Sequence, residues 1–266
     1  MQRILLAFSF LSFFLLTLTA TALADQFEEA KAAYNRGQYA RALELFRPLA
    51  KTGDAAAQNN LGVMYANGQG VATDYAEAMK WLRKAAEQDV AEAQSNIGAM
   101  YYNGQGVDKD YAEAAEWYRK AALQGDTSGQ VRLGEMYATG QGLAQSITEA
   151  QNWLLRALEG REAALYHDRS TINLGNASYS SLLTGRFIQA VEMAREGLAL
   201  DSGQAWIRIN LAHALLLQGQ RDEAMREYGQ CRTGHEKALL IDFEILKAIF
   251  PEKAGLIATA ALEMGL

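Results

Sequence analysis

The chain has 266 residues, half of them hydrophobic and only two of them proline, with a formal net charge of −6. This composition is typical of a helical protein that is long enough to bury a continuous core. The acidic balance, without any basic stripe, argues against nucleic acid as a partner.

Residues 1–24 have the pattern of a secretory signal peptide. Arg3 supplies a short positive region, an apolar run follows from Ile4 to Leu18, and Ala22-Leu23-Ala24 is a small-x-small cleavage sequence. An uncleaved membrane anchor is the alternative, although the apolar run is short and lacks a basic flank. We therefore expect cleavage after Ala24 and a periplasmic or secreted protein with no integral membrane span after cleavage.

Residues 25–53 predict a helical hairpin. It resembles a tetratricopeptide repeat (TPR) in its turn glycine and in its small and aromatic core positions, which are Gly37, Ala42 and Phe46. Pro48 lies inside the second helix, and we expect it to kink that helix or to end it early.

Residues 54–160 contain one 36-residue pattern three times in succession. The recurring positions are Leu61, Ile97 and Leu133; Gly62, Gly98 and Gly134; Tyr65, Tyr101 and Tyr137; Gly68, Gly104 and Gly140; Gly70, Gly106 and Gly142; and Trp81, Trp117 and Trp153. A fixed period of this length indicates stacked units, each of which buries its apolar face against its neighbours.

Each 36-residue unit predicts two helices. The first helices span about 55–67, 91–103 and 127–139, and the second span about 75–88, 111–124 and 147–159. Each second helix starts with capping-box spacing, in the pairs Asp74 and Glu77, Asp110 and Glu113, and Ser146 and Glu149. The second junction differs, because Asp89 replaces the usual glycine and Val90 replaces the capping aspartate, so we expect it to be weaker.

The pattern A-x-x-x-L-G-x-x-Y-x-x-G-x-G-V followed by D-Y-x-E-A-x-x-W-x-x-K-A-A closely resembles the Sel-one-like repeat (SLR), a relative of the tetratricopeptide repeat. The resemblance implies an all-α fold, a right-handed α-solenoid of helix-turn-helix repeats. For exported bacterial members it also implies roles in envelope assembly, polysaccharide export, regulation of a membrane sensor or host interaction.

The pattern breaks at residues 161–170, which predict either an extended helix or a short linker. Two TPR-like repeats follow at 171–234, with a period of 34 that relates Gly185 to Gly219. Cys231 is the only cysteine, so it has no intrachain disulfide partner. Its repeat position indicates a small buried residue, and an intermolecular disulfide is the alternative.

Residues 235–266 are apolar and lack the repeat pattern. We expect a helix over 238–250, a break at Pro251 and a last helix that ends near Glu263. The segment is predicted to cap the final face of the solenoid. Dimerisation through these helices, which would give a homo-oligomer, is the alternative.

The predicted binding site is the concave groove lined by the first helix of each repeat, which suits a protein or peptide segment. The candidate groove residues are Asn60, Asn96, Tyr102, Arg132, Glu135, Asn176, Tyr179, Asn210 and His213. The asparagine amides could bond a peptide backbone or, alternatively, the scaffold itself. Lys31 and Arg132 are the clearest groove cations and are expected to lie far apart along the stack, which argues against a C-terminal carboxylate reader.

No catalytic or metal-binding motif stands out. The G-x-G sequences recur with the repeat and follow helices, so they indicate turns, and the three histidines are scattered without ligand spacing. We therefore predict a non-enzymatic scaffold or adaptor without a cofactor. The alternatives are a peptidoglycan-directed enzyme that uses Glu135 or His213, and a structural homo-oligomer.

Overall fold

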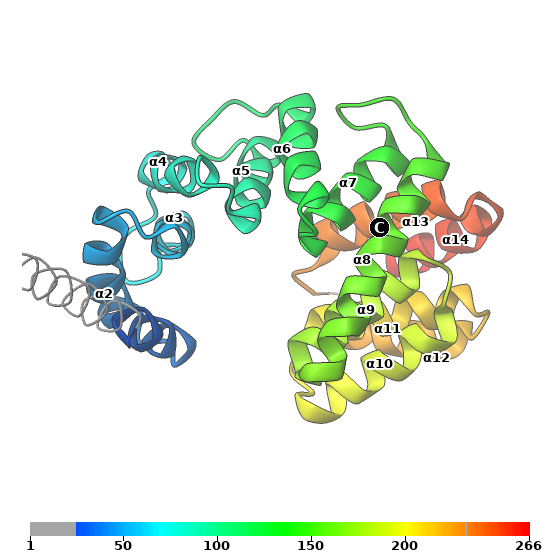
Figure 1. Cartoon of the computed structure of the whole chain (residues 1–266). Helices are drawn as coiled ribbons and strands as arrows, with labels where there is room; N and C mark the ends of the chain where they lie inside the picture. Colours follow the sequence, from blue (N-terminus) through cyan, green and yellow to red (C-terminus); the bar gives the residue numbers. More distant parts are fainter. Residues whose placement is uncertain (1–24, 232) are drawn as a thin grey trace, which may run out of the picture. The chain divides into compact units, whose positions relative to one another are not determined.

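The computed structural model describes residues 25–231 and 233–266, and the regular structure of these residues is helical. The predicted signal peptide lies outside the described residues. Residues 25–35 are helical, and the elements that follow (Figure 1) are α2 (Tyr39–Lys51), α3 (Ala55–Asn67), α4 (Tyr75–Ala86), α5 (Ala91–Asn103), α6 (Tyr111–Leu123), α7 (Thr127–Thr139), α8 (Ile147–His167), α9 (Thr171–Leu183), α10 (Phe187–Leu200), α11 (Ala205–Leu217), α12 (Arg221–Cys231), α13 (Glu236–Ile249), the 3₁₀ turn η1 (Pro251–Lys253) and α14 (Ala254–Met264).

The chain divides into an N-terminal unit that ends at Lys109 and a C-terminal unit that runs from Asp110 to Leu266. Both consist of helical hairpins stacked in sequence order, so the predicted all-α solenoid class is confirmed. A search of the described helices for a long apolar stretch found none that would cross a membrane.

The two glycines of each N/T-G-x-G loop have different structural roles. The first, as in Gly68, ends its helix in the left-handed conformation at φ 66°. The second, as in Gly142, also has positive φ and lies so close to the start of α6 that a Cβ atom would stand 2.3 Å from the Tyr111 carbonyl. These glycines are therefore turn residues, as the sequence predicts.

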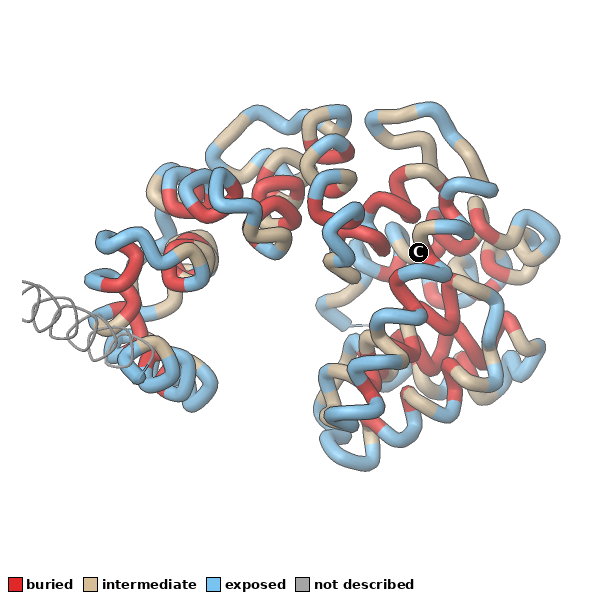
Figure 2. The backbone as a smooth tube through the Cα atoms, viewed as in Figure 1, coloured by how far each residue is buried: buried red, intermediate tan, exposed pale blue. Residues whose placement is uncertain are grey.

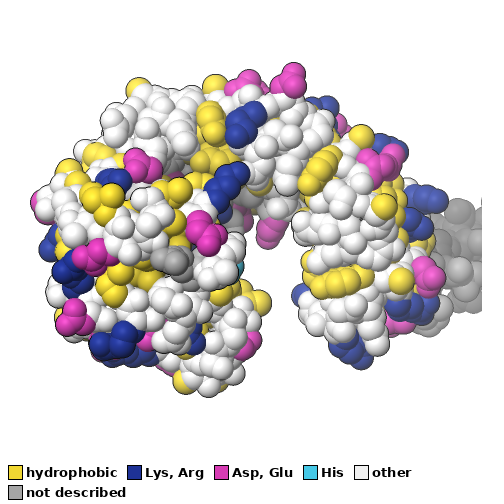
Figure 3. Space-filling model, turned by 180° about the vertical axis from the view of Figure 1, so that it is seen from behind, with side chains coloured by type: hydrophobic (Ala, Val, Ile, Leu, Met, Phe, Trp, Pro, Cys, Tyr) yellow, Lys and Arg dark blue, Asp and Glu magenta, His cyan; other side chains and the backbone are white. Residues whose placement is uncertain are grey.

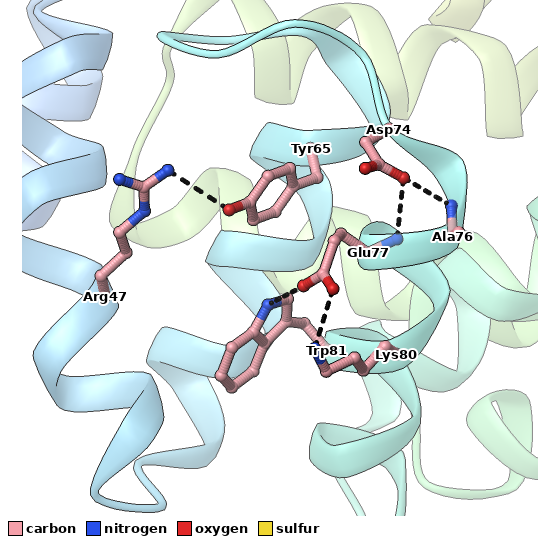
Figure 4. A network of polar contacts seen from close by, with 7 residues as sticks. All are labelled: Arg47, Tyr65, Asp74, Ala76, Glu77, Lys80 and Trp81. Carbon is pink, nitrogen blue, oxygen red and sulfur yellow. Dashed lines mark hydrogen bonds and ion pairs between the residues drawn. The ribbon is translucent and has the colours of Figure 1, made fainter.

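The capping boxes form only in part. The Asp74 carboxylate accepts from the backbone N–H groups of Ala76 and Glu77, both at 3.0 Å, as expected for an N-cap. The Asp74 N–H, however, donates to the Tyr65 carbonyl, so Glu77 has no role in capping it. Glu77 instead accepts from the Trp81 indole at 3.1 Å (Figure 4). The sequence spacing is correct, but the second half of the predicted box is wrong.

The sequence irregularity at Asp89-Val90 changes the junction before its helix, whereas the one at Pro48 does not shorten its helix. Asp89 has φ 59°, and Val90 makes no side-chain cap, so the junction before α5 lacks both groups that the other junctions use, as predicted. Pro48 does not end α2 early, because that helix runs on to Lys51.

One polar contact recurs at the 36-residue period between each second helix and the next first helix. The Arg47 guanidinium donates to the Tyr65 hydroxyl at 3.3 Å (Figure 4). Arg83 donates in the same way to Tyr101 at 3.2 Å, and Arg119 donates to Tyr137 at 3.4 Å. The contact thus joins the first hairpin to the three sequence repeats, and it stops where Leu155 occupies the arginine position.

In the C-terminal unit, α8 continues for 21 residues to His167, so the break at 161–170 begins as an extended helix. The C-terminal segment, which the sequence predicts as a cap on the final repeat, also packs against earlier repeats. Helix α13 packs against α7 and α8, and α14 packs against α11 (Figure 1). We call the surface of α7, α9 and α11 that α13 overlies the inner face.

The burial of α11 shows the effect of this packing by the C-terminal helices. Ten of its 13 residues are buried, compared with five of 13 in α3 (Figure 2). Phe243 of α13 packs edge-on against His213 at 5.3 Å between ring centroids and against Tyr228 at 6.0 Å. The C-terminal helices therefore complete the core of their unit along the inner face.

Candidate functional site: a pocket on the inner face of the C-terminal unit

A pocket with a volume of about 350 Å³ opens on the inner face, between the first helices of successive repeats and α13. We call it the inner pocket. Its lining residues are Ser128, Val131 and Arg132 of α7, Arg161 of α8, Asn176 and Tyr179 of α9, Trp206, Ile209 and Asn210 of α11, and His235, Ala238 and Asp242 in or beside α13. Four of the predicted groove residues are in this set: Arg132, Asn176, Tyr179 and Asn210.

Glu135 supports the pocket from behind. Its side chain is buried, accepts from the Tyr179 hydroxyl at 2.8 Å and accepts from the Arg132 guanidinium at 2.9 Å. Burial and the Glu135 charge raise the pKa of Tyr179 well above its usual value, so this hydroxyl stays protonated and donates. The same carboxylate raises the pKa of Arg132 further. Glu135 thus orients two pocket side chains, although the sequence predicts it as a groove residue itself.

Arg161 is a pocket residue that sequence reasoning missed. Its Nη1 donates to the Asn176 carbonyl at 2.8 Å and to the Ser180 hydroxyl at 2.7 Å. Burial lowers the pKa of the guanidinium, which remains charged at any physiological pH. Repeat periodicity gives no position for this residue, because it lies in the break at 161–170. The sequence feature that could have identified Arg161 is its place directly after the third 36-residue repeat, where the second helix of that repeat continues.

His213 requires a correction. Its ring is completely buried, with Nδ1 2.6 Å from the Tyr228 hydroxyl and Nε2 3.4 Å from the Asp242 carboxylate. It therefore links α11, α12 and α13 in the core and is not accessible to a partner. The near-continuous apolar sequence around it could have indicated this, because a helix that is apolar on all sides is covered on all sides.

The asparagines bond within the scaffold. Asn210 donates to the Gly175 carbonyl at 3.3 Å, Asn96 to the Asn59 side chain at 3.0 Å, and Asn60 to the Ala56 carbonyl at 2.8 Å. This geometry favours the scaffold alternative for these three amides. Asn60 and Asn96, together with the half-buried Tyr102, belong to the N-terminal unit, so they do not contribute to the inner pocket.

The other reactive groups give no second site. Within residues 25–231 and 233–266, no three His, Cys, Asp or Glu side chains are grouped as metal ligands would be. Cys231 is buried, its thiol donates to the Glu227 carbonyl at 3.3 Å, and burial raises its pKa to about 11. On the face drawn in Figure 3, acidic and basic side chains are interspersed and form no continuous basic field.

Comparison with known proteins identifies the repeats. The Sel1 repeat family matches residues 55–90, 91–126 and 127–160, and a tetratricopeptide repeat family matches residues 181–230. A search of curated protein sequences found no match.

Two solved structures are similar over most of the chain. A Sel1 repeat protein from Oxalobacter formigenes is 30% identical, with a TM-score of 0.55, over 90% of this chain and 99% of that one. A protective antigen with an SLR fold from uropathogenic Escherichia coli strains is 26% identical, with a TM-score of 0.52, over 92% of this chain and 54% of that one. Repeat proteins of this kind generally serve as non-catalytic scaffolds that bind other proteins. The chain belongs to the Sel1 repeat family and carries a TPR-like repeat after its Sel1 repeats.

Proposed function

We propose that the protein is an exported, non-enzymatic scaffold that binds a segment of another protein at the inner pocket. The observation that carries this proposal is the pocket itself, in which α7, α9 and α11 present charged, amide and aromatic groups beside an apolar lining. A concave pocket in which polar groups converge beside an apolar surface is the usual form of a specific binding site. The signal-peptide pattern of residues 1–24 supports the exported location, and envelope assembly or regulation is the role we propose there.

The pocket chemistry supports binding better than catalysis. A general base needs a carboxylate or imidazole within hydrogen-bond reach of a substrate. Both Glu135 oxygens already accept hydrogen bonds, and the His213 ring is sealed in the core. Two groups that a peptidoglycan-directed enzyme would use are thus engaged in structural contacts.

Site-specific photo-crosslinking in living cells tests the binding function. A photoreactive amino acid replaces Ser128, which is exposed at the pocket, or Gln230, which is exposed on α12 and serves as the matched control. We expect one discrete protein to be crosslinked from position 128 and not from position 230. Products that are the same from both positions, or no product from position 128, would contradict the proposal.

Export and the lack of catalysis have separate tests. Cell fractionation with N-terminal sequencing is expected to recover a mature chain that begins at Asp25, whereas an intact chain in the cytosol would contradict export. Purified protein is expected to leave labelled peptidoglycan intact. Turnover that disappears in Glu135→Gln would favour the enzyme alternative instead.

A further inference from the structure

One cation of the inner pocket, Arg161, forms no ion pair at contact distance, although the charges of Glu135 and Asp126 act on it from farther away. The two acceptors of Arg161, the Asn176 carbonyl and the Ser180 hydroxyl, are both uncharged. Among the described residues, no Asp or Glu forms an ion pair with Arg161, whereas Arg132 is paired with Glu135 and Arg208 with Glu227. A half-buried guanidinium that lacks a carboxylate retains the capacity for a charge-assisted, two-pronged hydrogen bond.

The carboxylates near the pocket do not fill this capacity. The Asp126 side chain caps α7 by accepting from the Gly129 N–H at 2.6 Å. Glu135 is 5% exposed, and one of its oxygens accepts from Tyr179 while the other accepts from Arg132. Asp242 belongs to α13, and its carboxylate lies 3.4 Å from the His213 ring. Arg161 therefore faces an open volume of about 350 Å³ in which an external acid can reach it.

We propose that the inner pocket binds a carboxylate carried by a partner peptide, with Arg161 as the principal contact and Arg132 beside it. This inference rests on the proposed function and specifies the partner chemistry for the same site. The sequence argues against a C-terminal carboxylate reader because the groove cations Lys31 and Arg132 lie far apart along the stack. The fold changes that argument by placing the end of α8 next to α7.

The rest of the pocket favours a peptide over a small free acid. Asp242 and the amide oxygens of Asn176 and Asn210 can accept hydrogen bonds from peptide N–H groups, and a bare dianion would be repelled by Asp242. Trp206 is 37% exposed and offers an apolar surface to a flanking side chain. A carboxylate on an extended peptide can therefore bond to the two arginines while the peptide N–H groups bond to Asp242.

Binding selection with random peptides tests this assignment. Two acetylated hexapeptide libraries serve as probes, one with amidated and one with free C-termini, and the whole protein is the target. We expect the retained peptides to carry a carboxylate. Enrichment of Asp and Glu in the amidated library assigns a side-chain carboxylate, whereas retention confined to the free-acid library, without Asp or Glu enrichment, assigns the C-terminal one. Because the chain has a net charge of −6, non-specific attraction would select basic peptides instead.

Amino-acid substitutions test whether the selected peptide binds at the inner pocket. For a selected peptide, Arg161→Gln is expected to weaken binding by about tenfold or more, as the loss of a charge-assisted bond predicts. Arg156→Gln removes the same charge from an exposed part of α8, where the side chain lies over Trp153, and is expected to change affinity less than about twofold. Ser128→Tyr, which places bulk at the pocket while retaining both arginines, is expected to block binding and keeps the test valid if Arg161→Gln unfolds.

The outcomes separate this inference from the proposed function. Retention that shows neither Asp and Glu enrichment nor a preference for the free-acid library, no bound peptide, or equal binding by wild type and by the folded Arg161→Gln and Ser128→Tyr variants would overturn the carboxylate assignment. The crosslinked protein of the preceding section would still stand in those cases, because its detection at position 128 does not depend on a carboxylate.

Discussion

The Sel1 repeats and the C-terminal helices of this chain are stabilised in different ways. From Arg47 to Tyr137, the same contacts recur at a fixed period: an arginine donates to a tyrosine hydroxyl, and a tryptophan indole donates to a glutamate. From residue 161 onward the described polar contacts are individual, as in the links of Arg161 to α9 and of His213 to α12 and α13.

This difference indicates where specificity can arise in a repeat protein. A contact that recurs in every unit maintains the spacing of the stack and is the same at each position along it. A contact that occurs once can create a unique pocket. The inner pocket forms where the periodic pattern has ended, because α8 overruns its repeat and α13 folds back onto α7.

Removing the ring of Phe243 should have the largest effect on this arrangement. The side chain is 1% exposed, so Phe243→Ala is expected to reduce the free energy of unfolding by about 3–5 kcal/mol. Chemical denaturation gives this value, and limited proteolysis should show earlier cleavage within α13. Leu240→Ala on the same helix, where the side chain is 46% exposed, is the control and should cost less than about 1 kcal/mol. Equal effects would mean that α13 does not pack through Phe243.

The alkylation rate of the Cys231 thiol measures whether the last repeat stays closed without periodic contacts. Burial raises its pKa from 9.0 to about 11, so the reactive thiolate at pH 8 is about a hundredfold scarcer than in an unfolded chain. Alkylation of the native protein is expected to be slower by at least that factor, and its rate should keep rising with pH up to about 11. A rate that levels off near pH 9 would show an exposed thiol and would reopen the intermolecular disulfide alternative.

Repeat architecture could be predicted from the sequence because packing positions recur. Gly62, Gly134 and their neighbours identify the close helix contacts, and a Cβ at either of these glycines would stand 2.7–2.8 Å from a leucine side chain. Asp89 and Val90 could be identified as a weak junction because cap chemistry is local. The glutamate half of the capping box does not form, because the Asp74 N–H donates to the Tyr65 carbonyl instead. That carbonyl comes from the preceding helix, so the local sequence pattern does not reveal the competition.

The inner pocket could be predicted only in part. Arg132, Asn176, Tyr179 and Asn210 follow from their positions in first helices, and the structure brings them together. Arg161, Asp242 and His235 come from segments that follow no repeat, so their placement depends on the tertiary packing of α8 and α13. For the same reason the sequence places His213 in an open groove, although α13 covers that part of the face.

Close approach at the repeat loops can be measured within the N-terminal unit. Gly106 and Gly37 share φ +72°, but a Cβ at Gly106 would lie 2.6 Å from the Tyr75 side chain, whereas nothing lies within 4 Å at Gly37. Gly37→Ala should therefore cost only the left-handed backbone strain, about 1–2 kcal/mol. Gly106→Ala should cost about 2–4 kcal/mol, because the overlap adds to the strain. Denaturation midpoints compare the two, and equal losses would show that the loop does not need to touch the preceding helix.

The smallest expected effect concerns the recurring arginine–tyrosine contact. Arg83 and Tyr101 are joined by one exposed hydrogen bond of 3.2 Å, so a double-mutant cycle with Arg83→Met and Tyr101→Phe should give a coupling of about 0.5 kcal/mol. Arg119 and Tyr137 form the same contact, in part buried, and should give an equal or larger coupling. The same cycle applied to Leu155 and Asn173, which occupy the corresponding positions after the pattern has ended, should give none. A coupling there as large as in the repeats would mean that the periodic contact contributes nothing specific, and that packing alone maintains the stack.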